Sequence, residues 1–139
     1  MRYIVTEEKN IALSKIEQGL KQTDLNYSIA EDSCLKWGNE LYGVLDITLP
    51  NSELFDEEIE ELKEDIKGAK GKNKKKVLVV LNNAKAIVAL QVLHQGREIE
   101  ETLEKIDPLW EWFFQNYEGL LQADSEGFII KVLKYSKYE

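Results

Sequence analysis

The best candidate for a chemically active position is His94, the only histidine in the chain, which stands in "LHQGRE" close to Arg97 and Glu98. A strand-like apolar run ends just before it, and open α/β sheets often place binding groups where strands end. Imidazole is also the side chain whose ordinary pKa lies closest to neutral pH. The alternative is a polar loop, because no Cys, Ser or Asp cluster adjoins the histidine. One hypothesis is therefore a small-molecule-binding protein or a minor enzyme with its site near His94 and Arg97.

Cys34 is the only cysteine, which excludes an internal disulfide and a multi-cysteine metal site. Neighbouring acids would raise the pKa of its thiol and weaken it as a nucleophile, so a structural thiol is expected. The motifs HExxH, GxSxG, GxGxxG, CxxC and the EF-hand loop do not occur. The sequence predicts no catalytic residue, no cofactor and no metal, and the missing motifs weigh against an enzyme without excluding one.

Two charged blocks follow one another in the middle of the chain. Residues 51–66 hold eight acids and one lysine, and residues 67–76, "KGAKGKNKKK", hold six lysines. The lysine run does not match the phosphate-binding pattern GxxxxGK[ST]. It is explained by a solvated connector at a helix end. A docking site for an anion or acidic partner is the alternative, and the two blocks could pair between molecules.

The stretch "DPLWEWFFQNYEG", residues 107–119, concentrates two Trp, two Phe and a Tyr. Most of them continue a stripe of apolar residues at helical spacing and should face the core. Trp112 falls outside the stripe, so if exposed it marks a contact surface. Pro108 should kink this helix or start a new one capped by Asp107. The stripe consists of Ile99, Leu103, Ile106, Trp110, Phe113 and Tyr117.

Periodicity and turn residues predict a single α+β domain over residues 1–139, with a mainly antiparallel sheet of about seven strands and three helices. After an opening strand "RYIVT", three αββ units give the order β-αββ-αββ-αββ. The likeness of "IEELKEDI" to "IEETLEKI" suggests an internal repeat. The helices are expected at about 7–20, 53–69 and 97–117, and the hairpin turns at 38–39, 82–83 and 125–127.

Two of the predicted strands, "VLVVL" and "AIVALQVL", are apolar on both sides and should lie centrally in the sheet with both faces covered. Three helices packed on one face would leave the other face bare. Either one helix crosses over, or a second copy of the chain covers it. This reasoning predicts a homodimer that acts through protein–protein contacts, and a self-associating, non-catalytic protein is our first hypothesis.

The composition is that of an ordinary globular protein, with 43% hydrophobic and 32% charged residues. The acidic net charge of −8 disfavours nucleic acid, because phosphate binding needs concentrated Lys and Arg. Binding through the lysine run is our least favoured hypothesis. The chain shows no signal-peptide pattern and no run of 18 apolar residues. We expect a cytoplasmic protein that does not bind membranes.

Residues 89–128 contain the phrases "DPLW" and "QADSEGF". This segment resembles small cyanobacterial proteins of uncharacterised function. The resemblance covers roughly the C-terminal third of the chain. It implies a fold family but no activity, and it carries no functional residue over to this sequence.

Overall fold

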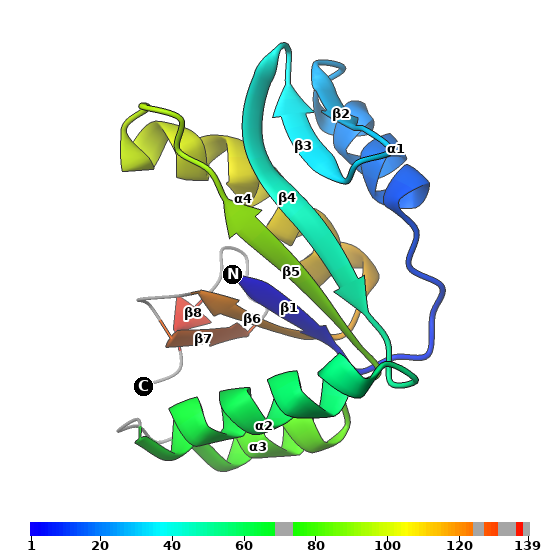
Figure 1. The fold of residues 1–139 in the computed structure, drawn as a ribbon, viewed down its shortest axis with the longest axis vertical. Helices are drawn as coiled ribbons and strands as arrows, with labels where there is room; N and C mark the ends of the chain where they lie inside the picture. The colour runs from blue at the N-terminus through cyan, green and yellow to red at the C-terminus, as the bar shows by residue number, and fades with distance from the viewer. Residues whose placement is uncertain (69–73, 124–126, 131–135, 138–139) are drawn as a thin grey trace.

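The computed structural model describes residues 1–68, 74–123, 127–130 and 136–137 of the chain (Figure 1). The described helices are α1 (Leu13–Thr23), α2 (Glu53–Gly68), α3 (Lys74–Asn82) and α4 (Ile99–Asn116). The described strands are β1 (Arg2–Val5), β2 (Tyr27–Ile29), β3 (Cys34–Trp37), β4 (Glu40–Thr48), β5 (Ala86–Val92), β6 (Gly119–Ala123), β7 (Gly127–Ile130) and β8 (Ser136–Lys137).

The strands form one sheet in the order β2-β3-β4-β5-β1-β6-β7-β8, in which every neighbouring pair is antiparallel. The predicted α+β class and antiparallel sheet are therefore confirmed. β1 lies between β5 and β6, so the first strand of the chain occupies the middle of the sheet. β5 lies between β1 and β4, as expected for a strand that is apolar on both sides.

The predicted repeat of three αββ units does not match the observed element order, which also has eight strands and four helices in the described residues. The main error is the segment "KKKVLVVLN", which is helix α3 and not a strand. Val77 and Leu81 stand four positions apart, so one helix face buries both of them. Asn82 ends this helix, and the expected hairpin turn at 82–83 is a helix-to-strand connection.

Two of the three predicted hairpin pairings are confirmed. β3 and β4 join through Gly38, whose φ of 61° requires the left-handed backbone that glycine adopts freely. β6 pairs with β7 as expected, although the expected turn residues Ser125 and Glu126 lie outside the described residues. A register shift opposite Leu35 and Lys36 makes a bulge in β4 at Tyr42, which lets both Tyr42 and Leu45 face the same core.

The sheet has a hydrophobic layer on each face. α1 and α4 cover the first face, where the buried side chains include Tyr3, Leu45 and Val88. α2 and α3 cross over to the second face and pack on Ile4, Ile87 and Leu120. Alternate residues of β1 and β5 belong to different layers, and both faces are buried around Ile4 and Ile87, whereas Ala89 and Gln91 on the second face of β5 are not fully covered. Sequence analysis left open whether a helix or a second copy covers the second face. α2 and α3 cross to this face and cover part of it.

Helix α4 runs without interruption through Pro108, so the alternative of a new helix beginning at Asp107 is wrong. A proline inside a helix costs about 3 kcal/mol through the lost hydrogen bond and the ring clash. Burial of the aromatic stretch offsets this cost, since the side chains of Trp110 and Phe113 are completely buried and those of Phe114 and Tyr117 nearly so. The predicted core-facing stripe is confirmed for Trp110, Phe113 and Tyr117, but it is wrong for Ile99, which is 63% exposed at the start of the helix.

None of the helices in the described part of the chain combines the length and apolar character needed to cross a membrane.

Candidate functional site

The predicted site residues His94 and Arg97 stand at the two ends of a tight turn after β5. The N–H of Arg97 donates a hydrogen bond to the carbonyl of His94 at 2.9 Å. Gln95 and Gly96 between them have φ values of 53° and 79°. This left-handed backbone lets the chain reverse within four residues. The turn brings the Arg97 side chain back against β4.

The guanidinium of Arg97 is used by the chain itself. Its Nη1 lies 3.2 Å from a carboxylate oxygen of Glu40. Its Nη2 donates to the carbonyls of Leu41 and Leu93 at 2.5 and 2.8 Å. Its Cζ lies 3.9 Å from the centroid of the Tyr42 ring. With 12% of the side chain exposed, Arg97 joins the turn to β4 and leaves little guanidinium surface for a ligand.

His94 is half-buried, and its Nδ1 has no hydrogen-bond partner among the described residues. Neither of the two hollows described below is lined by His94 or Arg97. The structure thus assigns Arg97 a structural part, and a ligand site around this pair stays a prediction.

Trp112, the third predicted site residue, lies half-buried between α4 and α1. A Cβ at Gly19 would lie 2.0 Å from its indole Nε1, so only glycine lets α1 approach the ring this closely. The rings of Phe113 and Tyr117 contact it edge-on, with centroids 5.1 and 5.7 Å away. Trp112 therefore packs α1 closely against α4. It also lines a hollow of about 310 Å³ together with Gln22, Thr23, Pro108, Glu111, Gln115 and Asn116.

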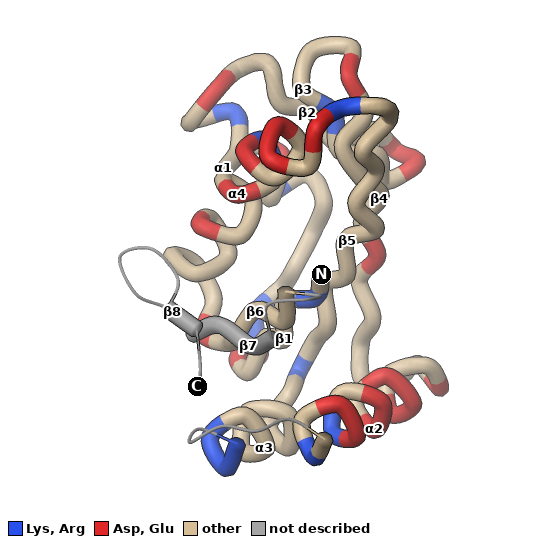
Figure 2. The backbone as a smooth tube through the Cα atoms, turned by 90° about the vertical axis from the view of Figure 1, so that its left-hand side faces the viewer, with Lys and Arg blue, Asp and Glu red and all other residues tan. Residues whose placement is uncertain are grey.

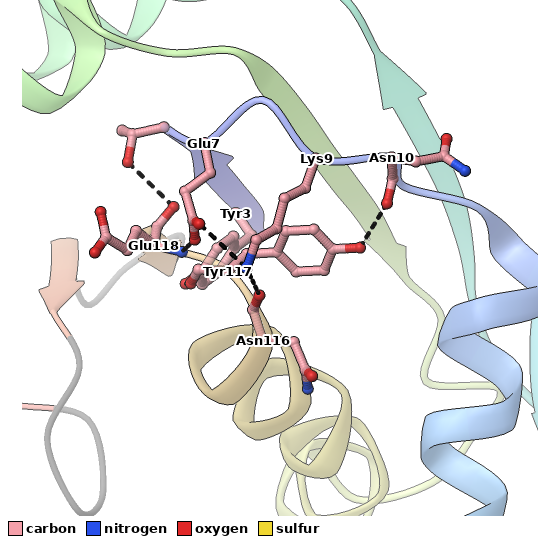
Figure 3. A network of polar contacts seen from close by, with 8 residues as sticks. Tyr3, Glu7, Lys9, Asn10, Asn116, Tyr117 and Glu118 are labelled. Atoms are coloured by element: carbon pink, nitrogen blue, oxygen red, sulfur yellow. Dashed lines mark hydrogen bonds and ion pairs between the residues drawn. The ribbon is translucent and has the colours of Figure 1, made fainter.

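Residues 6–10, called the strap here, cross the C-terminal end of α4 (Figure 3). Thr6 donates to the carbonyl of Glu118 through its N–H at 2.9 Å and its Oγ1 at 3.2 Å. The ammonium of Lys9 donates to the carbonyl of Asn116 at 3.2 Å. The last carbonyls of a helix lack partners within the helix and carry its negative dipole end. Lys9 satisfies one of them, the carbonyl of Asn116, and places a cation at this end of the helix.

Two buried tyrosines make hydrogen bonds at the same end of α4 (Figure 3). The hydroxyl of Tyr3 donates to the carbonyl of Tyr117 at 2.7 Å, and the hydroxyl of Tyr117 donates to the carbonyl of Asn10 at 2.8 Å. The ammonium groups of Lys9 and Lys15 lie 5.8 and 5.7 Å from the centroid of the Tyr117 ring. β1, the strap and the end of α4 therefore form one connected network.

The expected first helix, 7–20, is wrong at its start, because α1 begins at Leu13. Instead, the Glu7 carboxylate accepts the N–H of Glu118 and lies 3.2 Å from the ammonium of Lys9. The backbone hydrogen bond, and after it the lysine, hold the pKa of Glu7 below its ordinary value. Sequence reasoning missed the strap. The signal that could have revealed it is the lack of apolar residues at helical spacing in "TEEKN".

A hollow of about 520 Å³ lies beside this network and is lined by Tyr3, Glu7, Lys9, Phe114, Gln115, Asn116, Tyr117, Glu118 and Gly119. Its volume is typical of a small-molecule pocket. However, the bonds of Glu7, Lys9 and both tyrosines run to the chain itself. Burial, reinforced by the charges of Glu7 and Glu118, raises the pKa of the Tyr3 hydroxyl, so it remains protonated and donates to Tyr117. The polar groups here stabilise the fold.

Cys34 lies on β3. Burial, and after it a hydrogen bond to Asp32 and the charge of that carboxylate, raises the pKa of the thiol. The predicted effect of the neighbouring acids is confirmed for Asp32. Since the thiolate is the nucleophile, this environment makes Cys34 a weak one.

The second face of the sheet is covered at one end only. α2 reaches β4 at Thr48, whose hydroxyl donates to Glu58 at 3.3 Å, and the same carboxylate lies 3.3 Å from Nε of Arg2. Away from this end no described helix lies on the face, as both views of the chain show (Figures 1 and 2). We call this part the open face; it consists of Cys34, Lys36, Val44, Asp46, Ala89 and Gln91.

The sheet register gives the arrangement of the open face. Cys34, Val44 and Gln91 stand opposite one another on β3, β4 and β5 and form one row across the strands. Asp46 and Ala89 form the next row toward α2. Lys36 lies on the other side of the first row, two residues along β3 from Cys34. Cys34, Val44 and the exposed Gln91 thus lie between a cation and an anion, and Cys34, Val44 and Ala89 are half-buried.

Among the described residues, no group of three or more His, Cys, Asp and Glu side chains could hold a metal ion. Comparison with protein-family models, with curated proteins and with solved structures finds no match to this chain. The function must therefore be argued from the surfaces described above.

Proposed function

We propose that the protein is a non-catalytic, self-associating α+β protein that acts through protein–protein contacts, with the open face as its contact surface. The observation that carries this proposal is the incomplete cover of the second sheet face. Half-buried apolar side chains on a sheet lose further water contact when another layer packs on them, and this burial favours association. Packing of one sheet on another is a common way to bury such a face.

The charges of the open face also support a protein partner over a buried ligand. Lys36 and Asp46 form no ion pair within the described part of the chain, in contrast to Lys9, Arg2 and Arg97. Unpaired charges around an apolar centre match the polar rim and apolar core of a protein interface. The lone cysteine fits a reducing compartment, and we propose the cytoplasm as the location.

The test is the molar mass of the wild-type protein, measured by light scattering and sedimentation equilibrium up to the solubility limit. We expect a reversible dimer. Val44→Lys places a charge in the centre of the open face and should give a monomer. Val79→Lys is the matched control, because Val79 is 58% exposed on α3, away from the open face, and this change should leave the dimer intact.

A wild-type protein that remains monomeric at its solubility limit would remove the proposed function. A dimer that Val44→Lys does not weaken would show that the contact lies elsewhere on the molecule.

A further inference from the structure

We propose that two copies pack open face to open face about a two-fold axis that crosses β3, β4 and β5 along the row of Cys34, Val44 and Gln91. In this arrangement Lys36 of each copy pairs with Asp46 of the other. The inference rests on the proposed function and adds the geometry of the contact and the residues that specify it.

The position of the axis is limited by α2. This helix occupies the second face at the Thr48 end of β4, where Glu58 contacts both Thr48 and Arg2. A partner copy can approach only the remainder of the face, which lies toward the β3–β4 hairpin (Figure 2). The row of Cys34, Val44 and Gln91 runs through the middle of that remainder.

The charges of the open face fit this axis. Asp46 lies two residues along β4 on one side of the row, and Lys36 lies two residues along β3 on the other side. At about 3.3 Å per residue, each lies about 6.6 Å from the row. A two-fold axis along the row reverses the strand direction, so it places Asp46 of the partner copy over Lys36, offset by about one strand spacing of 4.8 Å. The long side chain of Lys36 spans that offset.

Within one copy the same two charges cannot satisfy each other. They lie about 13 Å apart along the strands, on opposite sides of the row. Neither forms an ion pair with another described side chain, although the charge of Lys36 does act on nearby Asp32. Pairing between copies therefore uses groups that the single chain leaves unused, and it does so twice because the contact is isologous.

The axis also brings the two Cys34 side chains to the same row on facing sheets. Packed sheets lie about 10 Å apart, so the two thiols come within reach of a short cross-linker. Three strands and three short rows make a small contact. We therefore expect a dimer at the weak end of specific interfaces, populated at high protein concentration.

The decisive experiment exchanges charges between copies. Lys36→Asp gives a chain with two acids at the paired positions, and Asp46→Lys gives a chain with two lysines there. Each variant alone should raise the dimer dissociation constant about tenfold or more, because like charges meet twice. An equimolar mixture should form heterodimers with one copy of each variant, detected by native mass spectrometry, because both contacts become attractive. Lys75→Asp, on α3, is the charge-matched control and should dimerise like the wild type.

Cross-linking gives a second, independent readout. A bismaleimide with a span of about 10 Å should join wild-type copies through their only cysteine, at mildly alkaline pH where the thiol reacts. The control combines Cys34→Ser with Leu25→Cys, which moves the thiol to a position that is 83% exposed and outside the open face. This control should dimerise but not cross-link.

The outcomes separate the two claims. A monomeric wild type overturns both the proposed function and this arrangement. A wild-type dimer whose single-charge variants do not form heterodimers on mixing, or whose Cys34 thiols react with monofunctional N-ethylmaleimide but are not cross-linked by the bismaleimide, leaves self-association standing and overturns this arrangement.

Discussion

The strap at the end of α4 and the open face of β3, β4 and β5 both carry charged side chains on a partly apolar surface, but they differ in where those charges find partners. At the strap, Glu7 and Lys9 bond to each other and to the backbone of residues 116–118. On the open face, Lys36 and Asp46 form no ion pair in the described part of the chain. Substitutions that remove contacts of the strap should therefore lower the free energy of unfolding. Substitutions on the open face should change self-association alone.

The largest effect is expected at Gly119, where β6 leaves the strap network. A Cβ there would lie 1.9 Å from the carbonyl oxygen of Ile4, which is fixed in the sheet and cannot yield. Gly119→Ala should lower the free energy of unfolding by about 3 kcal/mol, measured by urea denaturation. Gly68→Ala is the control, since nothing lies within 4 Å of its Cβ position. It should stabilise α2 by about 0.5 kcal/mol. Equal effects of the two changes would contradict the tight contact.

A smaller loss is expected from Tyr3→Phe, which removes the hydroxyl that donates to the buried carbonyl of Tyr117. An unsatisfied buried carbonyl costs about 1–3 kcal/mol of unfolding free energy. Tyr42→Phe is the matched control, because none of the described hydrogen bonds uses the Tyr42 hydroxyl and its ring still lies against Arg97. If both variants unfold at the same denaturant concentration, the hydrogen bond of the Tyr3 hydroxyl does not contribute to stability.

The pH dependence of stability should depend on Glu7. The folded protein holds the pKa of this carboxyl below its ordinary value of 4.5. The unfolded chain therefore takes up the proton first as the pH falls. The stabilisation by Glu7 is complete above pH 4.5 and is lost as the pH drops through the lower folded-state pKa. In Glu7→Gln the melting temperature should therefore fall less steeply as the pH drops through this range. Glu57→Gln, on the exposed side of α2, should keep the pH dependence of the wild type.

The smallest effect on stability is expected on the open face. Val44→Thr keeps the β-branched shape on a half-buried strand position and should change the free energy of unfolding of the monomer by no more than about 0.5 kcal/mol. The same variant should weaken self-association, measured by sedimentation, because a hydroxyl replaces a methyl group at the centre of the contact. A large loss of stability without a change in association would reverse the roles assigned to the two regions.

Local patterns predicted those elements whose spacing had one interpretation. α2 and α4 were expected from regular apolar steps, and the β3–β4 hairpin from its Gly-Asn turn. α3 was mistaken for a strand because "VLVVL" is apolar at every position, and such a run fits a buried strand as well as a short helix. Contact with α2 decided between them, and tertiary contact is not encoded in local periodicity.

The candidate surfaces were less predictable than the elements. Arg97 was singled out as a ligand group, yet the turn at Gln95 and Gly96 directs its guanidinium onto carbonyls of its own chain. The open face depends on the pairing of β3, β4 and β5, which lie up to about sixty residues apart in sequence. Only that pairing shows that Cys34, Val44 and Gln91 are neighbours. Sequence reasoning did anticipate that one sheet face would need a cover.

The position of β1 has a consequence for how the chain reaches this structure. Residues 2–5 pair with Ala86–Ala89 on one side and with Gly119–Gln122 on the other. Both partner segments are synthesised much later than β1, so this strand has neither neighbour when it leaves the ribosome. The α1–β4 segment has local partners early, but the middle of the sheet closes only when the last third of the chain has emerged. Such long-range pairing slows folding. It also leaves the apolar strand "YIV" without its partners during synthesis, when exposed apolar strands are prone to aggregate.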